Sequence, residues 1–208
     1  MQYDEDFMEC LKMMVLKMSA ISGFDITPDC DFPTLFKEHV DKLYGWQLVA
    51  AFDSKEGYLG GRYLPPHWRD DNALHGFKVS ASIKTAAAEG VDPTASLHEW
   101  YLSLPIQHVV CAAEQWRNPE LPDGEIIIPS PRHSDNTCRK LKSLLAPDIR
   151  SAMKKTGVSN ETYEQGFINQ WGEFLSRPLA FAIVKRNGQG FNDERNGGVQ
   201  WLSSEGIY

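Results

Sequence analysis

The sequence has 208 residues, of which 42% are hydrophobic and 24% charged, so the chain is long enough to bury a core and is not disordered as a whole. Its formal net charge of −7 excludes broad electrostatic attraction to nucleic acid or to an anionic membrane. Neither a membrane span nor a signal peptide fits, because no long apolar run exists and the N-terminus is acidic.

The cysteines and histidines argue against a metal site. The four cysteines are widely spaced and form no CxxC pair: Cys10, Cys30, Cys111 and Cys138. This spacing favours buried free thiols in a reducing compartment over disulfides or metal ligands. His39, His75 and His98 have no carboxylate or thiol partner at ligand spacing. We therefore expect a cytoplasmic protein with neither a metal nor a cofactor.

The N-terminal half predicts mainly helices. Residues 4–20 show apolar positions at three- and four-residue spacing, and Gly23 suits the end of that helix. A second helix is expected from Asp31 to Gly45, residues 46–52 are a plausible strand, and helices follow over 71–89 and after Asp92. The methionine-rich face of the first helix fits core packing better than a partner-binding surface.

A long loop between these elements carries several aromatic side chains: Tyr58, Tyr63, His67 and Trp68. Such residues could stack on a nucleobase. The favoured interpretation is that they fill the core beneath the connection.

The C-terminal half predicts a small antiparallel sheet with helices. Residues 107–113 and 124–128 are β-prone and are separated by a turn that ends in Asp-Gly, which favours a hairpin. Residues 164–168 and 174–175 predict a second hairpin around Gly172. Overall we expect an α+β fold, with a mainly helical region over 1–105 and an α+β module over 106–208.

Helix caps complete this module. Ser134 or Asp135 is expected to cap a helix whose apolar stripe runs through Leu141 and Leu145, and another helix should continue from Asp148. Ser176 is expected to cap a largely buried helix over 177–185. The final apolar cluster, residues 199–202, should dock, either on its own chain or on a neighbouring subunit.

Cationic and polar residues gather at two points of this module. Arg132 and His133 directly precede a predicted helix N-terminus, where free backbone N–H groups favour an anion, and Arg139 follows one turn later. Gln165 could present its amide to a base or ribose, and Arg177 could reach a phosphate. We take these five residues, together with Phe167, as the candidate ligand-binding site.

Structural explanations of the same residues remain open. Arg132 could pair with an acidic neighbour, His133 could pack on the strand, and Gln165 could satisfy backbone groups of the hairpin. His133 and Asp135 could also form an acid–base pair, a weaker hypothesis because no third partner is evident.

Five short motifs follow one another in the C-terminal half: Pro131-Arg132-His133 with Asp135, Glu164 to Phe167, Gly172 with Phe174, Ser176-Arg177, and Gly188-Gln189. In this order they resemble a family of small, mostly uncharacterised phage-encoded proteins. The resemblance covers roughly residues 107–208 and none of the N-terminal half. The tail from Leu202 to Tyr208 is also similar, although Pro178, Leu179 and Gly206 depart from the pattern.

The resemblance implies a phage accessory protein, a class that often counters host defence. It further suggests kinship with anti-Thoeris sponges, which are oligomers that sequester cyclic ADP-ribose-type signals without cleaving them. The expected partners are then a nucleotide-like small molecule and other copies of the chain, and neither nucleic acid nor membrane. The alternatives are a hydrolase of a phosphorylated nucleotide that uses His133, and a protein inhibitor of a host defence protein.

Overall fold

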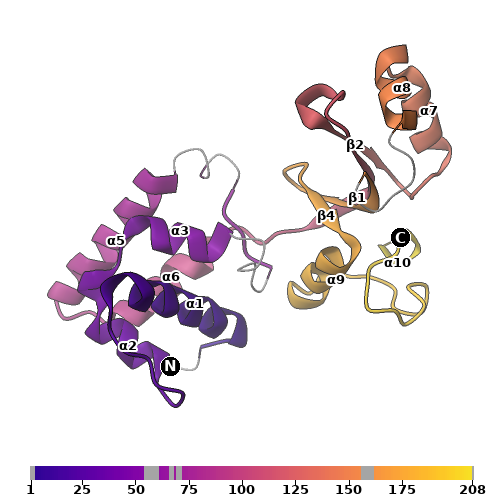
Figure 1. Ribbon diagram of the computed structural model, residues 1–208. Coiled ribbons are helices and arrows are strands. Elements are labelled where there is room, and N and C mark those ends of the chain that lie inside the picture. The colour runs from indigo at the N-terminus through magenta and orange to yellow at the C-terminus, as the bar shows by residue number, and fades with distance from the viewer. Residues whose placement is uncertain (1–2, 54–60, 66–67, 69–71, 156–161, 208) are drawn as a thin grey trace. The chain divides into compact units, whose positions relative to one another are not determined.

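The computed structural model describes residues 3–53, 61–65, 68, 72–155 and 162–207. The chain divides into two compact units, Met1–Ile106 and Gln107–Tyr208 (Figure 1). The first contains helices and the second a four-stranded antiparallel sheet with helices, so the predicted α+β class is confirmed. The expected division into a mainly helical region over 1–105 and an α+β module over 106–208 stays a prediction.

The N-terminal unit packs its helices around one core. They are α1 Glu5–Ser22, α2 Phe32–Glu38, η1 Val40–Lys42, α3 Gly45–Asp53, α5 Asn72–Ala88 and α6 Pro93–Ser103. Helix α1 begins where the Asp4 carboxylate accepts a hydrogen bond from the Phe7 N–H at 2.7 Å, and it ends at Gly23 with φ 72°. Met14 and Met18 are fully buried, so the prediction of core packing for the methionine-rich face is confirmed for both residues.

The strand predicted over residues 46–52 is wrong, because this segment forms helix α3. Gln47, Leu48, Val49, Ala51 and Phe52 are all buried, and in a short run that is buried almost throughout, periodicity cannot distinguish a helix from a strand. Gly45 begins α3 rather than ending a helix before it. A Cβ on Gly45 would lie 2.3 Å from the Phe77 backbone nitrogen, so the close approach of α3 to α5 requires glycine.

The aromatic loop is only partly within the described residues. Tyr58 and His67 lie outside them. Trp68 packs against the core of the unit and its ring centroid lies 4.1 Å from that of His75, while the Tyr63 N–H donates to the Pro105 carbonyl at 3.1 Å. For Trp68, the interpretation as a core-filling residue is therefore confirmed.

The C-terminal unit is built on a sheet with the strand order β2-β1-β3-β4, all antiparallel. The strands are β1 Val109–Arg117, β2 Glu125–Ser130, β3 Tyr163–Asn169 and β4 Phe174–Ser176. Both predicted hairpins are confirmed. Strand β2 continues through Pro129, which is tolerated because β2 lies at the edge of the sheet and Pro129 needs no N–H. The 3-10 turn η2 Pro122–Gly124 joins β1 to β2.

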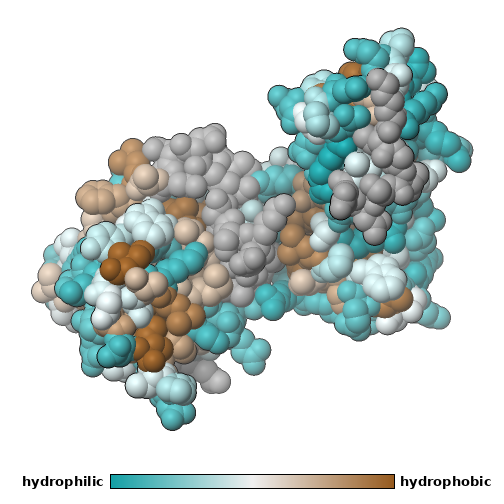
Figure 2. Space-filling model, in the orientation of Figure 1, coloured by the Kyte–Doolittle hydropathy of each residue, from teal (hydrophilic) through white to brown (hydrophobic). Residues whose placement is uncertain are grey.

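Four helices accompany this sheet: α7 Asn136–Leu144, α8 Pro147–Lys155, α9 Arg177–Arg186 and α10 Ser204–Ile207. Figure 1 shows α7 and α8 near β2, and α9 near β4. Residues of α7 and α8 form a small core with the sheet, and Figure 2 shows mostly hydrophilic residues over the outer side of this region. Within the described residues, we find no helix with the length and apolarity that crossing a membrane requires.

The last helix and the tail differ in detail from the prediction. Helix α9 buries only Ala180, Ile183 and Val184, so it is half-buried rather than largely buried. The tail returns to its own unit, where Leu202 is fully buried and its N–H donates to the Arg177 carbonyl at 3.1 Å. Trp201 stays 45% exposed.

Gly166 offers a test of the β3–β4 pairing. A Cβ at this position would lie 2.2 Å from the Leu175 carbonyl oxygen, so Gly166→Ala must displace backbone. We expect a loss of about 2 kcal/mol and a fall in Tm of about 4–8 °C. Gly190→Ala is the matched control, because no atom lies within 4 Å of its added Cβ, and it should change stability by less than about 0.5 kcal/mol. Equal Tm values for the two variants would contradict the packing argument.

Candidate ligand-binding site

Three of the predicted site residues meet although they come from separate segments. His133 lies on the connection between β2 and α7, Gln165 lies on β3, and Arg177 is the first residue of α9. One guanidinium nitrogen of Arg177, Nη2, donates to Gln165 Oε1 at 2.7 Å and lies 3.2 Å from His133 Nδ1. The Ser176 N-cap fixes the first turn of α9, so the start of the helix positions Arg177 beside β3.

The hydrogen bonds of His133 define its tautomer. Its Nε2 lies 2.6 Å from the carbonyl oxygen of Gly166, which only accepts, so Nε2 carries the proton. The Nδ1 lone pair then accepts from Arg177. Burial and the charge of Arg177 lower the pKa of His133, although the Gly166 bond and the carboxylates of Glu114 and Glu205 oppose this shift. His133 is therefore neutral near pH 7, and both of its ring nitrogens are hydrogen-bonded.

Phe167 supports the histidine instead of facing solvent. It is fully buried, and its ring meets the His133 imidazole edge-on with centroids 5.2 Å apart. Its role is to hold the imidazole plane, so it is not placed to contact a ligand directly.

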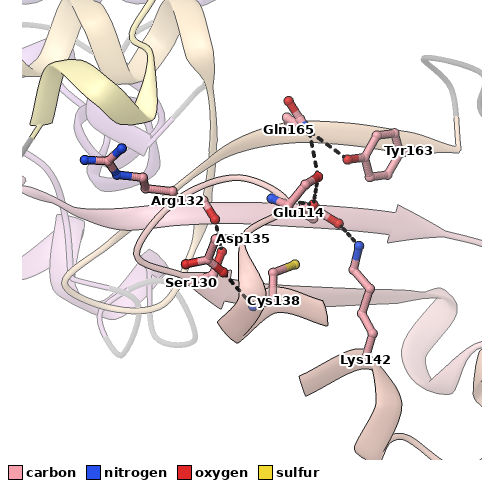
Figure 3. Close-up of polar contacts among 9 residues, drawn as sticks. Glu114, Ser130, Arg132, Asp135, Cys138, Lys142, Tyr163 and Gln165 are labelled. Carbon is pink, nitrogen blue, oxygen red and sulfur yellow. Dashed lines mark hydrogen bonds and ion pairs between the residues drawn. The ribbon is translucent and has the colours of Figure 1, made fainter. Parts of the chain in front are cut away.

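A buried carboxylate lies at the centre of the same sheet. Glu114 in β1 has no exposed surface; its Oε1 accepts from the Ser134 N–H at 3.1 Å and from the Ser134 hydroxyl at 2.7 Å, and its Oε2 pairs with Lys142 (Figure 3). Burial alone would raise the pKa of Glu114. The bonds from Lys142 and Ser134 outweigh burial and lower that pKa below its ordinary value, so the carboxylate is ionised.

Gln165 joins the two clusters into one network. Its amide nitrogen donates to the Tyr163 hydroxyl at 2.9 Å and lies 3.4 Å from the Ser134 hydroxyl oxygen. The resulting polar network consists of Arg177, His133, Gln165, Tyr163, Ser134, Glu114 and Lys142. Sequence reasoning missed four of them: Glu114, Lys142, Tyr163, and Ser134 in its role as hydrogen-bond donor to Glu114. The one available signal was a carboxylate directly after the small, apolar residues of a predicted strand.

Two predicted residues do not join this network. Figure 3 shows the Arg132 side chain extending away from Glu114 and Gln165, and within the described part of the chain its guanidinium has no hydrogen-bond or ion-pair partner. Arg139 is exposed and donates to the Asn136 side-chain oxygen at 2.7 Å.

The N-terminus of α7 already has an anion of its own. Asp135 is the N-cap, and its carboxylate accepts from the Cys138 N–H at 2.7 Å. A phosphate cannot use that N–H group unless Asp135 moves. His133 and Asp135 bond to different partners and not to each other, so the geometry does not form the suggested acid–base pair. Among the residues that the structure describes, no group of three His, Cys, Asp or Glu side chains could hold a metal ion.

The Nε–H group of Arg177 lacks a hydrogen-bond acceptor among the described residues. Its Nε is buried and makes no hydrogen bond in the described part of the chain, although Nη2 makes two. A buried donor left unpaired costs about 1–3 kcal/mol, so such a group is an unusual feature of a folded protein.

The comparisons with known proteins concern this unit alone. Residues 108–208 match the family model described as Phage T4 y16D protein. No curated protein and no solved structure matches the chain. The family match supports a phage-encoded protein, which is the coarser part of the predicted resemblance. The relation to anti-Thoeris sponges stays a prediction.

The Glu114–Lys142 pair can be tested with a double-mutant cycle. Lys142→Met leaves a buried carboxylate without its cation and should cost about 3–5 kcal/mol. Adding Glu114→Gln removes the charge, so the double variant should regain most of that loss in urea unfolding. If the two losses simply add, the pair is not coupled.

The same carboxylate predicts an acid-sensitive stability. Because the folded-state pKa of Glu114 lies below its unfolded value, the stability that Glu114 contributes is present above the unfolded pKa of about 4.3 and is lost as the pH falls through the folded pKa. We expect the urea midpoint of the wild-type chain to fall more between pH 5 and 3 than that of Glu114→Gln. Parallel curves for the two proteins would show that Glu114 does not carry this dependence.

Proposed function

We propose that the protein is a phage accessory protein that counters host defence in the host cytoplasm. In this proposal it binds an anionic nucleotide-type signalling molecule through its C-terminal unit and sequesters it without cleavage. The match to a phage protein family supports the assignment to a phage. The polar network and its neighbouring arginines support the binding of an anion.

The observation that carries the proposal is the presence of cationic donors without protein partners. The guanidinium of Arg132 is exposed, and Arg177 has a buried unpaired Nε, each within the described part of the chain. Guanidinium groups are well suited to phosphate, because their N–H groups form a planar fork. An anionic ligand would supply an acceptor for the exposed guanidinium of Arg132.

The geometry of His133 favours binding over hydrolysis. A general base needs a lone pair within reach of a water molecule or substrate proton. The Nε2 proton of His133 is directed at the Gly166 carbonyl, and its Nδ1 lone pair faces the cation of Arg177. The residue on which the hydrolase hypothesis depends is thus engaged in positioning Arg177.

Self-association belongs to the same proposal. A ligand held between subunits would be more enclosed and would leave more slowly than one bound to a single exposed surface. Light scattering of the purified chain would measure its oligomeric state directly.

Ligand depletion tests sequestration. The full chain is mixed with cyclic dinucleotides, cyclic ADP-ribose isomers and ADP-ribose, the free pool is measured by mass spectrometry, and the protein is then denatured by heat. We expect one compound to disappear and to return with unchanged mass and retention time. Arg132→Ala should weaken its binding at least about tenfold, because a charge-assisted hydrogen bond contributes about 1.5–3 kcal/mol.

Arg186→Ala, which removes an exposed cation from the last turn of α9, is the matched control and should bind as the wild type does. Return of an altered compound would overturn the non-catalytic proposal. If no compound is depleted, sequestration fails for this panel, and capture of a host defence protein becomes the function to test.

A further inference from the structure

A separate cavity of about 220 Å³ lies between β1 and the helices α7 and α8. It is lined by Trp116, Lys142, Arg150, Met153 and Lys154. Lys142 links this cavity to the polar network, but neither Arg132 nor Arg177 contributes to it. We call it the Trp116 pocket.

The floor of the Trp116 pocket is aromatic and apolar. The Trp116 ring packs against the Tyr163 ring with centroids 4.4 Å apart, and Met153 lies beside it in the small core. The indole N–H of Trp116 is buried and has no hydrogen-bond acceptor in the described part of the chain. This floor offers a planar aromatic ligand a surface on which to stack.

The rim of the pocket is entirely cationic. Lys142, Arg150 and Lys154 line it, and none of its lining residues is acidic. The Nζ of Lys142 lies 5.4 Å from the centroid of the Trp116 ring, within the range of a cation–π interaction. Its charge is already paired with Glu114, so the available charge comes from Arg150 and Lys154, which have no acidic partner in the described part of the chain.

The two cations that α8 contributes lie on one face of the helix. Arg150 and Lys154 are four residues apart on α8, where like charges destabilise a helix by about 0.2–0.5 kcal/mol.

The net charge of the whole chain does not repel an anion from this unit. Residues 1–106 carry 9 Lys and Arg against 16 Asp and Glu, whereas residues 107–208 carry 12 of each, so the formal charge of −7 lies wholly in the first unit.

We propose that the Trp116 pocket binds an aromatic anion. The aromatic ring lies on Trp116 and Met153, and the anionic group lies between Arg150 and Lys154. The volume limits the enclosed part to about one nucleobase or one substituted phenyl ring, since pockets for whole drug-sized ligands measure about 300–1,000 Å³. This site does not depend on the sequestration proposed above.

The indole resonances of the full-length chain provide a local readout. The chain has six tryptophans, and Trp116→Phe assigns the Trp116 cross-peak in a ¹H–¹⁵N correlation spectrum. AMP and phenyl phosphate are the probes, with adenosine and inorganic phosphate as comparisons that lack either the charge or the ring. We expect AMP and phenyl phosphate to shift the Trp116 peak, and both comparisons to bind at least about tenfold more weakly.

Two pairs of substitutions separate this pocket from the rest of the surface. Arg150→Ala with Lys154→Ala should weaken AMP binding at least about tenfold. Lys185→Ala with Arg186→Ala removes the same charge from the last turn of α9 and should leave the affinity unchanged. Arg177→Met should also leave the AMP-induced shift in place.

Three results would overturn the proposal. The first is that neither AMP nor phenyl phosphate moves the Trp116 peak. The second is that inorganic phosphate moves the peak with the same affinity as AMP. The third is that Arg177→Met removes the shift while the Arg150 and Lys154 substitutions do not. The last result would assign the ligand to the Arg177 network, which supports the proposed function while rejecting this pocket.

Discussion

The C-terminal unit depends on a single carboxylate that is buried in the middle of its sheet. Glu114 has no exposed surface, and an ionised carboxylate at such a position must be paired and hydrogen-bonded. Ser134 meets this requirement with both its N–H and its hydroxyl, and Lys142 meets it with its charge. Ser134 adopts φ 54° at this point, an uncommon conformation for a residue other than glycine. The bonds to Glu114 therefore define the elbow between β2 and α7.

The elbow in turn determines what the neighbouring residues can do. With Ser134 held by Glu114, the adjacent His133 reaches the Gly166 carbonyl, and its other nitrogen faces Arg177. Each of these two hydrogen bonds occupies a ring nitrogen of His133 that a general acid or base would need. The network thus holds the guanidinium of Arg177 in a fixed orientation, which fits the anion binding proposed above.

Much of the local structure could be predicted because it depends on neighbouring residues. Asp4, Asp92, Asp135 and Ser176 act as helix caps, and the Asp-Gly turn forms its hairpin. Glu114 could not be recognised, because a charged residue in a strand usually faces solvent. Its burial follows from the register that pairs it with Ile128 on one side and Gln165 on the other, beneath α7. The error at residues 46–52 has a similar cause: the approach of Gly76 to Gly45 is a contact between distant segments.

The two units differ in net charge, and this difference favours a different kind of ligand for each unit. Every candidate anion site described above lies in residues 107–208, the formally neutral part that matches the phage family model. The N-terminal unit carries the whole net negative charge, which disfavours anionic ligands there. It does expose large apolar side chains, with Trp46 at 51% and Phe77 at 65%, and exposed apolar surface is a feature of protein-interaction sites. Inhibition of a host protein would therefore be expected to depend on the N-terminal unit, and small-molecule sequestration on the C-terminal unit.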